Sequence, residues 1–230
     1  MAKKSKEAEK DEVIVDVEEV YSKTEDFINE NQNLIMGVVG GIIAVIVGFY
    51  AYNKVYLEPL EEEAHGQMFA AEQYFQKDSF DLALNGDGNY LGFIDITDEY
   101  GNTSAGNLAH YYAGISYLRL GDYETAIKEL EEFESAGEML GAVAQGAIGD
   151  AYMELDNVDD ALTHYEKAVA ASENNFTSPV YLQKAGFAAE KAGNYDKAID
   201  YYTQVKENYP TTNEGRNADK YIARAEANLN

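Results

Sequence analysis

Three stretches of this sequence share one pattern: HYYAGISYLRLGDYETAI at 110–127, QGAIGDAYMELDNVDDAL at 145–162, and LQKAGFAAEKAGNYDKAI at 182–199. Each has a glycine at its fifth position, turn-forming residues further on, and then an alanine. The alanines, Ala126, Ala161 and Ala198, are 35 and 37 residues apart. A period of this length indicates stacked helical hairpins, each of which buries its apolar face against the next. The sequence therefore predicts an all-α solenoid.

The residues within each repeat suit a pair of closely packed helices. The glycines Gly114, Gly149 and Gly186 would let the first helix of a hairpin approach the second, with the repeat alanines buried at the contact. The pairs Gly121-Asp122 and Gly193-Asn194 supply residues that favour the left-handed turn between helices. We expect larger apolar residues to fill the space between the helices: Leu130, Tyr165 and Tyr202.

A fainter copy precedes these three repeats, and a further helix follows them. The upstream copy is carried by Ala71, Tyr74, Phe80 and Ala83. The segment Asn85-Gly-Asp-Gly-Asn89 is predicted to interrupt its second helix, which resumes over Tyr90 to Tyr100. Pro210 ends the last repeat, and residues 213–229 are predicted to form a capping helix with Tyr221 and Ile222 facing inward. The repeat domain thus covers residues 55–230, with three clear repeats and one divergent N-terminal repeat.

Residues 34–52, LIMGVVGGIIAVIVGFYAY, are almost wholly apolar and carry no charge. About 20 such residues in a helix cross the hydrocarbon core of a bilayer. A cleaved signal peptide would have a shorter apolar stretch and small residues at its cleavage site. A buried soluble helix would tolerate the glycines and β-branched residues poorly. We therefore predict a single transmembrane helix over 34–54, with Tyr50, Tyr52 and Tyr56 at one interface.

The first 33 residues are predicted to form an acidic cytoplasmic tail, disordered at first and then helical. The helical part is suggested by apolar residues at helical spacing: Val17, Val20, Tyr21, Thr24, Phe27 and Ile28. Lysines are frequent in the tail, and only Lys54 follows the apolar run before Lys77. This asymmetry favours a cytoplasmic N-terminus and a repeat domain on the other side of the membrane.

Composition argues against several classes of function. The formal net charge is −25, and such a surface repels nucleic acid. Without cysteine the chain has no disulfides, thiol catalysis or cysteine-type zinc sites. The histidines His65, His110 and His164 lack the ligand spacing of a metal site. The acidic segment 156–160 lacks the glycine and glutamate of a calcium hand. We predict a non-enzymatic protein without cofactor or metal.

The repeats resemble the tetratricopeptide repeat, a helix–turn–helix unit of about 34 residues. In that family the first helix of each hairpin lines a groove that binds polypeptides. The resemblance implies a protein-binding groove formed by Met68, Phe75, Leu108, Tyr111, Ile115, Leu118, Arg119, Met153 and Phe187. These side chains suit an extended apolar segment or an amphipathic helix, and the basic residues that clamp a C-terminal carboxylate are mostly missing. Alternatively, many of them pack against the neighbouring repeat or the capping helix.

The apolar run carries a second interaction signal. Gly37, Gly41, Ala44 and Gly48 share one helical face, and the Gly37–Gly41 spacing lets two membrane helices meet closely. Glycine is also common in membrane helices that make no such contact. The residues therefore predict a helix-packing face within the membrane.

A short tail, one span and a terminal repeat array together resemble the YfgM-type ancillary subunit of the bacterial Sec translocon. That resemblance implies a single-pass inner-membrane protein with a periplasmic repeat domain. Its implied partners are SecYEG, a membrane-anchored periplasmic chaperone and unfolded client polypeptides emerging from the channel. Two alternatives remain: an adaptor that docks one folded partner of a cell-envelope assembly or division complex, and a cytoplasm-facing receptor in the reverse orientation.

Overall fold

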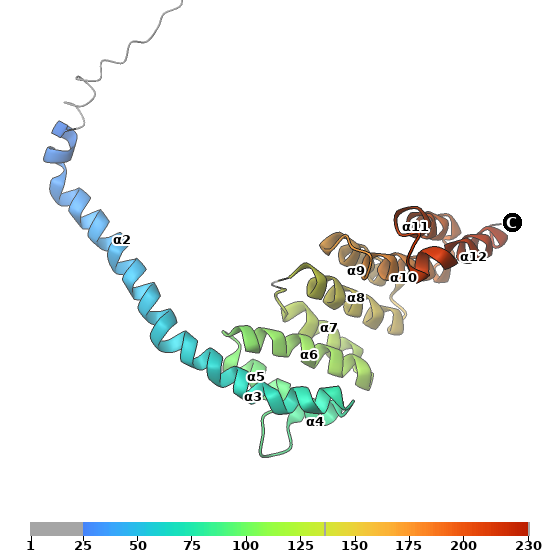
Figure 1. Ribbon diagram of the computed structural model, residues 1–230, viewed down its shortest axis with the longest axis horizontal. Helices are drawn as coiled ribbons and strands as arrows, with labels where there is room; N and C mark the ends of the chain where they lie inside the picture. Colours follow the sequence, from blue (N-terminus) through green and yellow to red (C-terminus); the bar gives the residue numbers. More distant parts are fainter. Residues whose placement is uncertain (1–24, 136, 230) are drawn as a thin grey trace, which may run out of the picture. The chain divides into compact units, whose positions relative to one another are not determined.

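The computed structural model describes residues 25–135 and 137–229. In these residues it contains helices and no strands (Figure 1). The chain divides into two units, one ending at Tyr56 and one beginning at Leu57. The first contains α2 (Gln32–Tyr52), followed by a π-helical turn, η1 (Asn53–Leu57), which crosses the boundary. The second contains α3 (Glu58–Gln76), α4 (Phe80–Asn85), α5 (Phe93–Tyr100), α6 (Ser104–Leu120), α7 (Tyr123–Glu132), α8 (Glu138–Glu154), α9 (Val158–Ala171), α10 (Ser178–Lys191), α11 (Tyr195–Asn208) and α12 (Asn213–Ala227).

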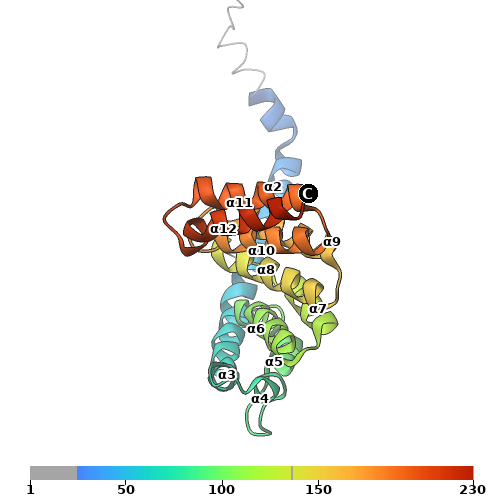
Figure 2. The same ribbon diagram turned by 90° about the vertical axis from the view of Figure 1, so that its right-hand side faces the viewer.

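The second unit is a stack of helical hairpins in chain order, from α3 at one end to α12 at the other (Figure 2). The pairs α6–α7, α8–α9 and α10–α11 correspond to the three clear repeats of the sequence. Each of these pairs is antiparallel because the turn between its helices is short. The predicted all-α solenoid is thus confirmed for this unit.

Each hairpin turn uses one residue in the left-handed conformation. Gly121 and Gly193 have φ values of +87° and +75°, as the sequence predicted. In both turns the next amide donates to a carbonyl five residues back, Asp122 to Tyr117 and Asn194 to Ala189, which ends the first helix. The side chain of that same residue then caps the second helix, as Asn194 does by accepting from the amide of Lys197 at 3.1 Å.

The other two hairpin turns place an aspartate in the left-handed position. Asp78 has φ +55° between α3 and α4, and Asp156 has φ +61° between α8 and α9. A non-glycine residue is strained in this conformation. In each case a cation from the following hairpin lies nearby: Arg119 is 4.0 Å from Asp78, and Lys191 is 2.5 Å from Asp156. These exposed pairs are weak individually, and they join each aspartate turn to its neighbouring hairpin.

The helices of a hairpin meet at the predicted small residues. Ala126, Ala161 and Ala198 are fully buried. A Cβ atom added to Gly149 would lie 2.6 Å from the ring of Tyr165, and one added to Gly186 would lie 2.2 Å from the ring of Tyr202. Glycine is therefore required where these rings cross the first helix.

The first hairpin departs from the pattern as predicted, with one correction to its boundary. Helix α4 stops at Asn85, and the chain resumes as a helix at Phe93 rather than Tyr90. Asp87 closes the intervening loop, because its carboxylate accepts from the amides of Asn89 and Tyr90 and from the hydroxyl of Tyr74, which lies 2.8 Å away. This arrangement lowers the pKa of Asp87, chiefly through the bond from the Asn89 amide.

Two of the connections between hairpins are built alike. Residues 100–106 (YGNTSAG) precede α6 and residues 209–215 (YPTTNEG) precede α12. In both, the threonine hydroxyl donates to the tyrosine carbonyl and accepts from the glycine amide: Thr103 acts between Tyr100 and Gly106, and Thr212 between Tyr209 and Gly215. The capping helix α12 therefore follows the last hairpin as α6 follows the first, and Tyr221 and Ile222 pack against its core as predicted.

In the first unit, residues 25–30 are helical and α2 follows from Gln32. Within the described residues, one helical run that begins at Gln32 is long and apolar enough to cross a membrane, judged by length and composition. No residue of α2 is buried. Phe27 and Ile28 of the predicted amphipathic tail helix lie in the helical part, whereas Val17, Val20, Tyr21 and Thr24 lie outside the described residues.

Candidate binding face on the first helices

Helix α6 carries the largest group of predicted groove residues. Leu108 is half-buried against the core that α3 to α6 share. Tyr111, Ile115 and Leu118 are half-buried against residues of α7 and α8. Burial raises the pKa of the Tyr111 hydroxyl, which therefore stays protonated at neutral pH. The structure thus brings these three side chains together, partly exposed and partly packed on the next hairpin.

The predicted outward position of Met68 is wrong. Met68 on α3 is only 2% exposed and belongs to the core made with α4, α5 and α6. The divergent hairpin contributes the extra helix α5, whose Phe93 and Ile96 pack in the same cluster. Phe75, also predicted to face the groove, lies among aromatic rings, with the ring of Tyr112 5.0 Å away and that of Phe80 5.5 Å away.

Two predicted positions lie nearer the C-terminal end of the array. Met153 on α8 is half-buried against the core of the last two hairpins. Phe187 on α10 is covered by the capping helix: its ring centroid is 5.1 Å from that of Tyr221, and the Arg224 guanidinium lies 5.3 Å from it. Phe187 therefore packs against α12 in this structure and is only partly exposed.

The cations on α6, α8 and α10 are all paired within the protein. Arg119 and Lys191 meet the aspartates of the preceding turns, and Lys184 on α10 lies 2.6 Å from Asp150 on α8. Helix α8 itself has no lysine or arginine. Each lysine and arginine on α6 and α10 thus has a carboxylate of the protein itself as its partner.

Asp150 is the centre of a polar cluster on this face. It accepts from the hydroxyl of Tyr165 at 2.8 Å as well as from Lys184. The Lys184 ammonium also lies 5.7 Å from the ring centroid of Tyr181. Burial, with Asp150 adding to it, raises the pKa of Tyr165 far above its usual value and that of Tyr181 to about 12. Both hydroxyls therefore stay protonated at neutral pH, and that of Tyr165 donates to Asp150.

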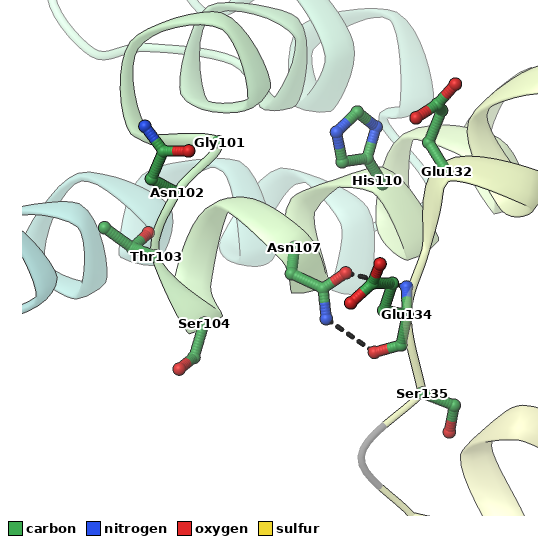
Figure 3. A pocket seen from close by; sticks show the side chains of 9 residues that line it. All are labelled: Gly101, Asn102, Thr103, Ser104, Asn107, His110, Glu132, Glu134 and Ser135. Carbon is green, nitrogen blue, oxygen red and sulfur yellow. Dashed lines mark hydrogen bonds between the residues drawn. The ribbon is translucent and has the colours of Figure 1, made fainter.

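A pocket of about 590 Å³ opens where α6 begins and α7 ends (Figure 3). Its lining is polar, and the side-chain amide of Asn107 holds the main chain of Glu134 by two hydrogen bonds of 2.7 and 2.8 Å. His110 lies 2.8 Å from Glu129. Within the described ranges, no three metal-ligating residues gather as a cation site would require.

The face of α2 predicted to pack in the membrane has no contacts in this structure. A Cβ atom added at Gly37, Gly41 or Gly48 would meet no atom within 4 Å, and Ala44 is exposed. A small-residue face of this kind requires a second helix, so its role stays a prediction.

The connection between α9 and α10, where Phe176 is 77% exposed, was not predicted from the sequence. Its signal is the polar run Ser172-Glu-Asn-Asn175 just before the aromatic residue, which breaks the helical pattern. The pairing of Arg119 and Lys191 with aspartates of the preceding turns was also not predicted, although each cation lies one hairpin after such an aspartate.

The geometry agrees with comparisons of the sequence to known families. Residues 108–135 and 142–211 match family models described as tetratricopeptide repeats. These two segments are therefore similar to tetratricopeptide repeats. Proteins built of such repeats are typically non-enzymatic scaffolds that bind other proteins, and no catalytic family is indicated for this chain. No curated protein matches the sequence.

Solved structures show the same repeat fold. A putative kinesin light chain with nearly identical TPR-like repeats, from Podosopora anserina, has a TM-score of 0.57 at 15% identity, covering 73% of this chain and 87% of that chain. MamA has a TM-score of 0.50 at 19% identity, covering 69% of this chain and 94% of that chain. At these identities the likeness concerns the fold alone.

Proposed function

We propose that this tetratricopeptide repeat protein is a membrane-anchored adaptor whose repeat array binds apolar, neutral or basic polypeptide segments. The binding face is formed by α6, α8 and α10, around Tyr111, Ile115 and Leu118. These side chains are partly exposed on neighbouring turns of one helix, which suits an extended apolar segment or an amphipathic helix.

The observation that carries this proposal is the pairing of the cations. Arg119, Lys184 and Lys191 each meet a carboxylate of the protein's own chain, so a partner's carboxylate would have to displace one of these to bind. The chain also carries a net charge of −25, which repels acidic segments and attracts basic ones. Recognition therefore rests on apolar contact, and charge selects against acidic partners.

The anchor and the partner machine belong to the same proposal. Helix α2 is apolar and long enough to span a bilayer, and the lysine asymmetry favours an array outside the cytoplasm. Combined with the resemblance to YfgM-type subunits, this supports a bacterial inner-membrane protein that works beside SecYEG on polypeptides emerging from the channel. The adaptor for a single folded envelope partner is the alternative, distinguished by tight binding of one protein rather than weak binding of many.

Peptide binding to the full chain in detergent micelles tests the binding face. Three labelled peptides would share one apolar core and differ in carrying a free C-terminal carboxylate, an amidated end, or an amidated end with two lysines. We expect the lysine peptide to bind most tightly and the free carboxylate least. Tyr111→Ser should weaken binding at least five-fold, whereas Leu120→Ser, at an exposed position on the same helix, should not. Preference for the free carboxylate would overturn the proposal.

Topology and partner are tested separately. Protease added to spheroplasts should degrade the array beyond Pro59 and spare the tail, and survival of the array until lysis would contradict the export reading. Copurification of the channel in mild detergent should be lost on Gly41→Leu, because the larger side chain separates closely packed helices while leucine still favours the bilayer. Retained copurification would place the contact elsewhere in the chain.

A further inference from the structure

The connection between α9 and α10 is held by one asparagine. The Asn174 side-chain oxygen accepts from the amides of Phe176 and Thr177, at 2.6 and 2.8 Å. Its amide nitrogen donates to the hydroxyls of Ser172 and Thr177, at 2.7 and 2.8 Å. The hydroxyl of Ser178 completes the network, because it accepts from the main-chain amide of Asn174 and donates to the main-chain carbonyl of Ser172. Ser172, Thr177 and Ser178 are buried. The loop backbone is therefore fixed before any partner arrives.

This network does more than join two helices. The connections before α6 and α12 do that with a single threonine side chain and expose no large apolar residue in the turn itself. The connection before α10 instead buries three hydroxyl groups and presents Phe176, the most exposed large apolar side chain of the array. Single exposed apolar residues are common on protein surfaces. An exposed ring on an immobilised backbone is different, because binding a partner there costs little further conformational entropy of the main chain.

A cavity of about 480 Å³ is lined in part by the loop residues that come just before Phe176 in the chain. Its lining consists of Glu173, Asn174 and Asn175 from the same loop, and of Asn208 and Tyr209 at the end of α11. The side-chain amide of Asn174 already makes its hydrogen bonds within the loop. The side chains of Asn175 and Asn208 are exposed and make no hydrogen bond in the described part of the chain. The cavity therefore offers two amide groups and one carboxylate, and the exposed Phe176 directly follows its lining residue Asn175 in the chain.

We propose that Phe176 and the adjoining cavity form a second polypeptide-binding site, distinct from the face of α6, α8 and α10. The occupant is an extended segment that places an apolar side chain on the Phe176 ring and a main-chain peptide group against Asn175 and Asn208. Side-chain amides pair with peptide groups through both donor and acceptor. Glu173 is the charged residue of the lining, so the segment is neutral or basic.

Photo-crosslinking of the full chain in detergent micelles tests the site. p-Benzoylphenylalanine replaces Phe176 in one variant and Phe69, a 65% exposed ring on α3, in a matched control. The probe is a labelled peptide of alternating Leu and Ser with two lysines and blocked ends, and a twin has glutamates instead of lysines. We expect at least five-fold more crosslinking of the lysine peptide at 176 than at 69, and weaker crosslinking of its acidic twin.

Two further variants separate this site from a packing role and from the binding face. The double variant Asn175→Ala and Asn208→Ala should reduce the crosslinking yield at 176, whereas Tyr111→Ser should leave that yield unchanged. The two proposed sites are therefore tested independently of each other. Phe176→Ser should not change the melting temperature, whereas Asn174→Ala should lower it. The proposal is overturned by equal yields at 176 and 69, by crosslinks to a second copy of the chain or to lipid instead of peptide, or by a lower melting temperature for Phe176→Ser.

Discussion

The two ends of the repeat array fill the space between their helices with different aromatic chemistry. Around α3 to α6, Phe75, Phe93 and Tyr112 contact one another through their rings, with centroids 5.0 to 6.3 Å apart. Around α8 to α11, tyrosine rings lie over glycines, and the hydroxyls of Tyr165 and Tyr201 reach carboxylates, Tyr165 bonding to Asp150 at 2.8 Å and Tyr201 making a short bond to Glu166.

This difference separates two sources of stability. The cluster of Phe75, Phe93 and Tyr112 depends on ring volume and shape, because none of these side chains makes a hydrogen bond among the described residues, whereas Tyr74 and Tyr100 near it bond to Asp87 and Glu63. At the C-terminal end, tyrosine hydroxyls also make hydrogen bonds to charged groups. Some of these bonds join successive hairpins, as those among Tyr201, Glu166 and Lys197 do. We therefore expect loss of volume to dominate in the cluster of Phe75, Phe93 and Tyr112, and loss of a hydroxyl to matter more for the tyrosines of the C-terminal end.

The largest effect is expected where ring volume alone is removed. Phe93→Ala empties a fully buried position in the N-terminal cluster and should lower the free energy of unfolding by about 3–5 kcal/mol, measured by chemical denaturation. Phe69→Ala, at an exposed ring on α3, serves as the control and should change it by less than about 0.5 kcal/mol. A loss of similar size in both variants would show that the cluster is not the core of this end.

The next effect tests the contact between glycine and tyrosine at the C-terminal end. Gly186→Ala places a methyl group 2.2 Å from the Tyr202 ring and should destabilise by about 1–3 kcal/mol. Gly66→Ala, where a Cβ atom meets nothing within 4 Å, should instead stabilise α3 by about 0.5–1 kcal/mol through its helix propensity. Thermal unfolding would resolve these opposite signs, and a stabilising Gly186→Ala would show that Tyr202 moves freely.

Removing hydroxyl groups sharpens the comparison most directly. Tyr165→Phe loses the bond to Asp150 and should cost about 0.5–1.5 kcal/mol. Tyr112→Phe, within the N-terminal cluster, removes a hydroxyl that makes no hydrogen bond among the described residues and should be almost neutral. Equal costs in equilibrium unfolding would remove the distinction between the two ends.

The smallest effect is a dependence on pH through His164 of α9. Burial, with Lys167 nearby, lowers the pKa of His164 below its ordinary value of 6.5. The unfolded chain therefore binds a proton at a higher pH than the folded one, so stability is full above about 6.5 and falls as pH drops towards the folded pKa. His164→Gln should flatten the melting temperature between pH 7.5 and 5.5, whereas His65→Gln, at an exposed site, should not. An unchanged slope in His164→Gln would contradict this assignment.

The repeats, turns and close helix contacts could be predicted from the sequence because they depend on local residues at a fixed spacing. Gly121 and Gly193 mark turns whatever lies next to them. The partners of outward positions could not be predicted in the same way. Met68 is covered by an extra helix that only the divergent hairpin contributes, and Phe187 is covered by a capping helix that follows the repeats. Phe176 lies outside the repeat pattern, so periodicity gives no information about it.

The shared connector before α6 and α12 has a consequence for how such arrays change length. Because Thr103 and Thr212 make the same two bonds, α12 begins at a junction that accepts a first helix equally well. A duplicated copy of α6 to α11 inserted at residue 209 would meet the same tyrosine carbonyl, threonine and glycine that α6 meets now. Whole hairpins could therefore be added before α12, by gene duplication or by engineering, without a new linker.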